Sequence, residues 1–330
     1  MGYLNKIFQG LGIPQSALLS IIFGMMLLSF PVGAYVVFET DIGDDITYEF
    51  PISHLEPQLG GISSVIKFEI EIGDVFIALW SMYGIFFSIA TLGPRSNFLQ
   101  NLMPIMTEGD VSKTSNNMVP IIKWFSILVL ISAIINFIQE SVGITTSPPQ
   151  IENNLVQFYA ATLSPLLEEI GFRVILIGIP MFLIYSYRKS FNSFFKSLWI
   201  PHEYLDIPNK KGIVFLIMFV GILFGLAHVL SDDSWSNGKF AQATASGIIL
   251  GWVYFRYGFV AALLIHWGTN YFIFSFVYFI SEVNTISVER AFSHSLLGTM
   301  EMLFVVSGVV SSAIILVHFI NSKKGNKLQI

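Results

Sequence analysis

Long apolar stretches separated by short polar segments dominate this chain. A helix needs about 20 consecutive apolar residues to cross the hydrocarbon core of a bilayer. Eight stretches reach or approach this length, so the pattern predicts an all-α, polytopic transmembrane helix bundle with about eight spans. The predicted spans cover residues 16–38, 75–92, 122–142, 156–187, 213–230, 241–255, 258–280 and 298–320.

The span at 241–255 is shorter than the others and is rich in small residues. These small residues allow a neighbouring helix to approach closely in lipid, which favours a packed position inside the bundle. They are Ala241, Ala243, Ala245, Gly247 and Gly251.

The positively charged residues predict how the chain is oriented in the membrane. If the N-terminus is inside, most Lys and Arg residues fall in inner segments, and only Lys67, Lys239 and Arg290 fall in outer ones. This asymmetry predicts an integral, multi-pass membrane protein with both termini cytoplasmic. The inner residues are Lys6, Arg95, Lys113, Lys123, Arg188, Lys189, Lys196, Lys210, Lys211, Arg256, Lys323, Lys324 and Lys327.

The segment from residue 39 to residue 74 is the largest predicted outer loop, and it is strongly acidic. Residues 66–72 alternate apolar with charged side chains, which is the period of a β-strand. Residues 47–50 could pair with them in a small β-hairpin. A solvated loop without strands is the alternative interpretation.

Composition supports the membrane interpretation and excludes several other classes. The chain is 54% hydrophobic and only 12% charged, against about 25% charged in soluble domains. No basic patch with interleaved aromatic residues is present, so no nucleic acid partner is expected. The chain has no cysteine, which excludes disulfides, thiolate metal ligands and a cysteine nucleophile.

The first candidate site residues are Glu168, Glu169 and Arg173, inside the span at 156–187. Ionisable residues at membrane depth are costly and generally functional. Glu169 and Arg173 are four residues apart, with the acid first, which is the favourable order for an ion pair on one helix face. Glu168 points about 100° away from Glu169. It has no local cation, which suits a proton acceptor.

Two further spans each carry polar residues at helical spacing. Phe224 and His228 share one face of the span at 213–230. His266 and Asn270 share one face of the span at 258–280. Each pair alone is also compatible with a satisfied core histidine or with interhelical hydrogen bonding.

Together, the three spans supply the groups that hydrolysis of an amide requires. Glu168 can take a proton from water, and a histidine can position that water. His266 and Asn270 can donate to an oxyanion. A carboxylate with neutral imidazoles can also bind a divalent metal such as zinc, in which case the ligands are Glu168, His228 and His266. The His-Glu-x-x-His signature of zinc proteases is absent.

These ordered motifs resemble those of the CPBP family of intramembrane proteases, which includes the type II CAAX prenyl proteases and the Abi proteins. The family pattern is Glu-Glu-x-x-x-Arg, then Phe-x-x-x-His, then His-x-x-x-Asn. Here these motifs are Glu168-Glu169 with Arg173, Phe224 with His228, and His266 with Asn270. The resemblance covers roughly residues 120–280.

The resemblance implies a membrane-embedded endopeptidase whose substrate is a membrane-associated or lipid-modified polypeptide. Glu168 would activate the water with help from His228, and His266 and Asn270 would stabilise the oxyanion. Glu169, Arg173 and Phe224 would support the site.

The predicted organisation has three parts. These are N-terminal spans with the acidic outer loop at 1–119, a CPBP-like protease core at 120–280, and a C-terminal span with a basic tail at 281–330. The lipid bilayer is then a partner along the whole chain. Two other functions remain open on sequence grounds: an ion-coupled transporter in which Glu168 and the histidines relay protons, and a non-catalytic membrane scaffold.

Overall fold

The computed structural model describes residues 3–43, 71–108, 116–145, 153–186, 190–208, 210–230 and 237–327. Helices form most of these ranges, which confirms the all-α prediction. The first half of the chain contains α1 (Tyr3–Glu39), the 3₁₀ turn η1 (Asp41–Gly43), α2 (Ile72–Leu92), α3 (Phe98–Glu108), α4 (Met118–Ser141), α5 (Asn154–Glu168), the π-helix η5 (Glu169–Gly178) and α6 (Ile179–Tyr185). The second half contains α7 (Phe191–Trp199), α8 (Pro201–Tyr204), α9 (Lys211–Leu230), α10 (Lys239–Tyr257), α11 (Phe259–Trp267), the π-helix η6 (Gly268–Phe272), α12 (Ile273–Asn284), α13 (Val288–Phe292) and α14 (Ser295–Lys327).

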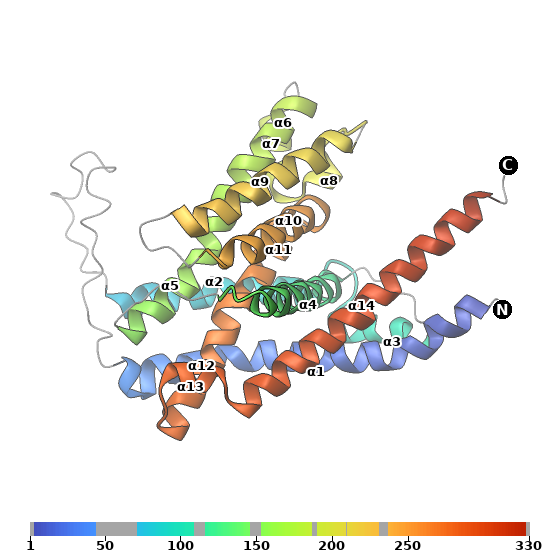
Figure 1. The fold of residues 1–330 in the computed structure, drawn as a ribbon. Coiled ribbons are helices and arrows are strands. Elements are labelled where there is room, and N and C mark those ends of the chain that lie inside the picture. The colour runs from blue at the N-terminus through green and yellow to red at the C-terminus, as the bar shows by residue number, and fades with distance from the viewer. Residues whose placement is uncertain are drawn as a thin grey trace.

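Six helical stretches of the described chain are long and apolar enough to cross a membrane. They are Gly10–Glu39, Ile72–Leu92, Met118–Ser141, Lys211–Leu230, Phe259–Asn284 and Ser295–Ile320. Each of them matches one of the eight predicted spans. The protein is therefore an integral, multi-pass membrane protein, and α1 begins on the same side of the bundle on which α14 ends (Figure 1).

The other two predicted spans are helical but do not meet the same test of length and hydropathy. The predicted span at 156–187 consists of α5, η5 and α6 in direct succession, so a π-helix divides its α-helix. The predicted span at 241–255 is α10, which carries Lys239, Gln242 and Arg256 among its small residues. The total of eight spans therefore stays a prediction, as does the cytoplasmic location of both termini.

The predicted β-hairpin lies almost wholly outside the described residues. At its edges, Asp41–Gly43 forms the turn η1 and Ile72 begins α2.

Close packing of α9 against α10 confirms the prediction made from the small residues of α10. A Cβ atom added at Gly225 would overlap Thr244 Oγ1, and one added at Gly247 would lie 3.0 Å from Gly221 Cα. The two helices run side by side (Figure 1). Their close approach places the last turn of α9, which carries His228, against the first turns of α10.

Aromatic side chains hold α1, α2 and α5 around the segment that carries His266. Trp267 stacks on Phe30 and on Tyr271, with ring centroids 5.1 Å and 5.4 Å apart. The Tyr271 hydroxyl donates to Ser29 O at 3.1 Å. The Tyr83 hydroxyl of α2 donates to Thr162 O of α5 at 2.9 Å. These contacts fix the end of α5 relative to the end of α11, where the candidate site lies.

Candidate active site

Three of the predicted site residues come together from three different helices. Glu168 ends α5, His228 lies in the last turn of α9, and His266 lies at the end of α11. Glu168 Oε2 is 3.8 Å from His228 Nε2 and also 3.8 Å from His266 Nε2. These distances are too long for direct hydrogen bonds. The carboxylate is 26% exposed, so one side of it is open.

The second nitrogen of each imidazole already has an acceptor as its partner. His228 Nδ1 lies 2.8 Å from Phe224 O, and His266 Nδ1 lies 2.8 Å from Glu169 Oε1. A carbonyl and a carboxylate can only accept, so both Nδ1 atoms carry the proton in this arrangement. In neutral imidazoles, both Nε2 atoms then present lone pairs towards Glu168.

Glu168 Oε2 therefore faces two other acceptors and lacks a donor. It is buried and has no hydrogen-bond partner. Buried polar atoms without partners are uncommon and generally mark an unoccupied ligand position or a functional group. Two atoms 3.8 Å apart can both accept hydrogen bonds of about 2.8 Å from one water that lies beside the line joining them. The geometry thus fits a small molecule with two protons to donate.

Glu169 has a role that the local spacing did not predict. Its Oε2 lies 3.1 Å from Arg173 Nε, which agrees with the predicted ion pair, while its Oε1 accepts from His266. Glu169 and Arg173 are almost completely buried, with side-chain exposures of 0% and 1%. One carboxylate therefore neutralises the arginine and also orients the histidine of another helix.

Phe224 completes the support around Arg173. The guanidinium carbon lies 4.4 Å from the centroid of the Phe224 ring, which is close enough for a cation–π interaction. The guanidinium nitrogens make no hydrogen bonds, and the Phe224 ring and the Glu169 carboxylate lie close to its charge. The same ring lies 4.5 Å from that of His228. Phe224 thus links the buried arginine to a histidine that faces Glu168.

Asn270 does not contact the Glu168 carboxylate directly. Its Nδ2 donates to Ser164 Oγ at 3.3 Å, and its Oδ1 accepts from Thr269 Oγ1 at 3.3 Å. Ser164 is one turn before Glu168 on α5, so it is on the same side of that helix. The role of Asn270 therefore stays a prediction, and Ser164 is a neighbour that the motifs did not include.

Both polar motifs on the α5 and α11 segments lie where an α-helix changes to a π-helix. η5 begins at Glu169, and η6 begins two residues after His266 and contains Asn270. π-helical turns are rare and are frequent at functional sites. A wider turn changes the direction of the following side chains, which ordinary helical spacing does not predict.

The predicted metal ligands do not form a metal site. Among the described residues, no group of three or more His, Asp or Glu side chains has an arrangement that could hold a metal ion. Glu168, His228 and His266 are close together but do not meet this condition. The prediction of a metalloprotease thus finds no support, and no step below is assigned to a metal.

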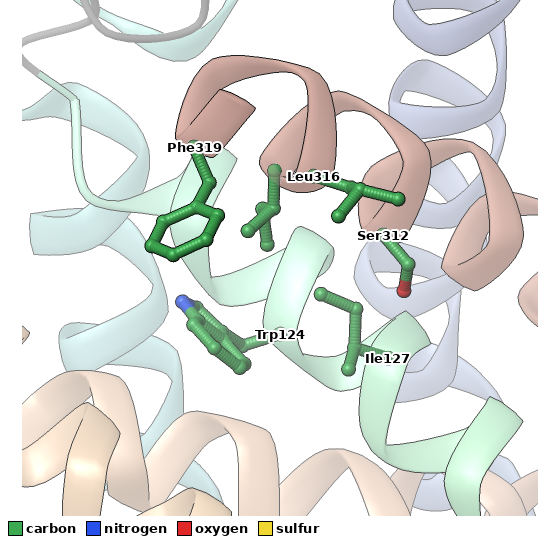
Figure 2. A pocket seen from close by; sticks show the side chains of 6 residues that line it. Trp124, Ile127, Ser312, Leu316 and Phe319 are labelled. Carbon is green, nitrogen blue, oxygen red and sulfur yellow. The ribbon is translucent and has the colours of Figure 1, made fainter. Parts of the chain in front are cut away.

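A cavity elsewhere in the described chain has no part in this arrangement. It has a volume of about 330 Å³ and is lined by Trp124, Ile127, Ser312, Ile315, Leu316 and Phe319. Figure 2 shows these side chains projecting from α4 and α14. The lining is apolar except for the Ser312 hydroxyl and the indole nitrogen of Trp124, and it includes none of the predicted site residues.

The fold and the cluster together define a class: a helical membrane protein with a carboxylate and two imidazoles gathered between its helices. A family model described as type II CAAX prenyl endopeptidase Rce1-like matches residues 151–272. Residues 151–272 are therefore similar to this family, which confirms the resemblance to the CPBP and CAAX proteases. Within that range lie all seven predicted site residues, from Glu168 to Asn270. No curated protein and no solved structure matches the chain.

The family match also bears on the three functions that the sequence left open. It supports a peptide hydrolase of the CAAX type in the membrane and gives no support to an ion-coupled transporter. In such a family the substrate is a prenylated polypeptide in a membrane.

Proposed function

We propose that this protein is an intramembrane endopeptidase in which Glu168 activates a water molecule for attack on a peptide bond. The observation that carries the proposal is the orphaned Glu168 Oε2, buried and 3.8 Å from each of two imidazole nitrogens. A water held there would donate its protons to acceptors that otherwise have no hydrogen-bond donor. The substrate is a membrane-associated polypeptide, most simply one with a prenylated C-terminal tail, as the family match suggests.

The first step transfers a proton from this water to Glu168. The water oxygen forms a bond to the carbonyl carbon of the substrate, and the carbonyl oxygen becomes a tetrahedral oxyanion. His228 Nε2 holds the water during attack, because its Nδ1 is occupied by Phe224 O. A positioned general base of this kind typically contributes a factor of about 10² to 10⁴.

The second step breaks the carbon–nitrogen bond, and the proton held by Glu168 passes to the leaving amine. In this arrangement His266 Nε2 is an acceptor, so the predicted donation to the oxyanion would require a second proton on the ring, taken up from bulk water before the substrate binds. Glu169 Oε1, 2.8 Å from Nδ1, holds the ring in place. Asn270 Nδ2 is the second candidate donor, because its amide carries two N–H groups and its 3.3 Å bond to Ser164 uses one of them.

A cleavage assay in proteoliposomes tests this proposal. The substrates are peptides with a farnesylated cysteine three residues from the C-terminus, and mass spectrometry detects the products. The variant is Glu168→Ala, and the matched control is Glu289→Ala, which alters an exposed glutamate on α13. We expect the wild type and the control to cleave the peptides. The Glu168→Ala protein should cleave them at least about 10²-fold more slowly.

Three other outcomes would overturn the proposal. Cleavage at the wild-type rate by Glu168→Ala would show that another group activates the water. A folded wild type that cleaves none of the peptides would favour the non-catalytic scaffold. Uptake driven by a pH gradient without proteolysis would favour the transporter instead.

A further inference from the structure

Basic side chains gather at one end of the bundle, away from the candidate active site. We call Lys196, His202, Lys210, Lys211 and Arg256 the basic cluster. They come from α7, α8, the residues at the start of α9 and the end of α10. α8 packs beside α10, and α7 packs beside α8. In Figure 1 both lie towards the end of the bundle where α9 begins. This is the end that the distribution of Lys and Arg predicts to be cytoplasmic.

Contacts within the cluster bring residues distant in sequence together. Arg256 Nη1 lies 3.0 Å from His202 Nδ1 and 3.1 Å from His202 Nε2. Lys196 Nζ lies 5.8 Å from the centroid of the Tyr204 ring. Burial, and then the positive charges of Arg256 and Lys210, lower the pKa of His202 below its ordinary value. The imidazole is therefore neutral near pH 7, and the lysines and the arginine carry the charge.

The cluster keeps an excess of positive charge after its acidic neighbours are counted. Among the described residues 190–211 and Arg256, four lysines and arginines stand against Glu203 and Asp206. The side chains of Lys196, Lys210 and Arg256 are exposed. They can therefore reach a ligand without first breaking a buried ion pair.

An exposed aromatic stripe lies directly beside these charges. Phe191, Phe195 and Trp199 recur every four residues on α7, so they share one helix face. Their exposures are 77%, 56% and 46%. Phe194, on another face, packs against Phe182 of α6 with ring centroids 4.9 Å apart. The helix therefore packs on the bundle through Phe194, while Phe191 and Phe195 stay exposed. Trp199 ends the stripe against Phe259 of α11, with ring centroids 5.7 Å apart.

Specific contacts hold α7 in this position. The Ser190 side chain caps its start by accepting from Ser193 N. The Tyr254 hydroxyl of α10 donates to Leu198 O at 2.8 Å. Gly258, with φ of +89°, allows close approach, because a Cβ there would lie 2.5 Å from Trp199 O. The aromatic stripe is thus presented by a fixed element and not by a loose loop.

We propose that the basic cluster and the aromatic stripe form a binding surface for the headgroups of anionic phospholipids in the surrounding bilayer. Trp is favoured at the membrane interface, where its ring is apolar and its N–H reaches water, and exposed Phe side chains add apolar surface that can enter the headgroup boundary. Basic side chains at the same depth attract anionic headgroups, and each contributes about fivefold in affinity. The surface has both elements at the ends of α9 and α10, where a bundle that crosses the bilayer meets the headgroups.

Lipid titration of the purified full-length protein in detergent tests this proposal. Phosphatidylglycerol and phosphatidylcholine with the same acyl chains are added separately, and native mass spectrometry measures the bound lipid. The variant is Lys210→Gln with Arg256→Gln. The matched control is Arg95→Gln with Arg290→Gln, which removes two exposed positive charges outside the cluster. Thermal unfolding of each protein verifies that it is folded.

We expect wild-type protein to prefer phosphatidylglycerol, and the Lys210→Gln/Arg256→Gln protein to lose about 10- to 30-fold of that affinity. The control should change by less than about twofold. Equal affinity of the wild type for both lipids, or equal phosphatidylglycerol affinity of the variant and the control, would overturn the proposal. Tight binding of soluble glycerol phosphate in place of the lipid would also overturn it and indicate a site for free phosphate.

Discussion

Glu168 and Glu169 are neighbours in sequence, but their surroundings in the bundle are opposite. Glu169 is fully buried, lies 3.1 Å from Arg173 Nε and accepts from His266 at 2.8 Å. Glu168 is 26% exposed, and its Oε2 has no hydrogen-bond partner. Glu169 therefore stabilises the bundle and orients His266, while Glu168 remains available for chemistry. A fully buried charge needs a partner, which Arg173 provides for Glu169. An ionisable group at membrane depth whose oxygen has no hydrogen bond, such as Glu168, is a candidate functional group.

The largest predicted difference between the two carboxylates is in stability. Glu169→Gln leaves the Arg173 charge buried without its counter-ion, which should lower the free energy of unfolding by about 3–5 kcal/mol. Glu168→Gln should leave that free energy unchanged or raise it, because Oε2 forms no hydrogen bond. Reversible unfolding in mixed micelles measures both. Equal destabilisation by the two substitutions would remove the distinction.

Loss of the cation–π contact between Phe224 and Arg173, the partner of Glu169, should have a smaller effect on stability. Phe224→Leu keeps an apolar side chain and removes the ring 4.4 Å from the Arg173 guanidinium. We expect a loss of about 1–2 kcal/mol in the free energy of unfolding. Repeating the substitution in an Arg173→Met protein isolates the contact. A loss of the same size in that background would mean that the ring only fills space.

The smallest predicted effect is on catalysis near Glu168, and it comes from the hydrogen bond between Ser164 and Asn270. Ser164→Ala removes a hydrogen bond of 3.3 Å, typically worth about 1 kcal/mol. If Asn270 must be oriented for catalysis, kcat should fall about fivefold. Ser88→Ala, which alters an exposed serine on α2, serves as the control and should not change kcat. An unchanged kcat in both proteins would remove Ser164 from the site.

Features that depend on local spacing were predictable from the sequence. The ion pair between Glu169 and Arg173 follows from a separation of four residues, and the structure contains it. Six of the eight spans predicted from the apolar runs are helices that can cross a membrane. The small residues of α10 predicted its close packing against a neighbouring helix, which is α9. Each of these depends on neighbours along one helix or on an average over a window, which the sequence displays directly.

Features that depend on contacts between distant residues were not predictable in the same way. The hydrogen bond from His266 to Glu169 joins positions 97 residues apart. Helical spacing grouped Glu169 only with Arg173, so its contact with His266 was missed. The π-helices η5 and η6 were missed as well, because the templates for apolar periodicity assume 3.6 residues per turn. The convergence of Glu168, His228 and His266 was expected only because three spans each carried polar groups.

The central claim is that Glu168 activates a water that attacks the substrate directly, and isotope labelling during a single turnover tests it. Excess enzyme cleaves the prenylated peptide in water enriched in oxygen-18, and mass spectrometry examines the new C-terminal carboxyl group and the peptide that contains Glu168. Direct attack predicts one oxygen-18 atom in the product and none in Glu168. An unlabelled product together with a labelled Glu168 would contradict the account, because it would mean that the carboxylate itself attacks the peptide bond.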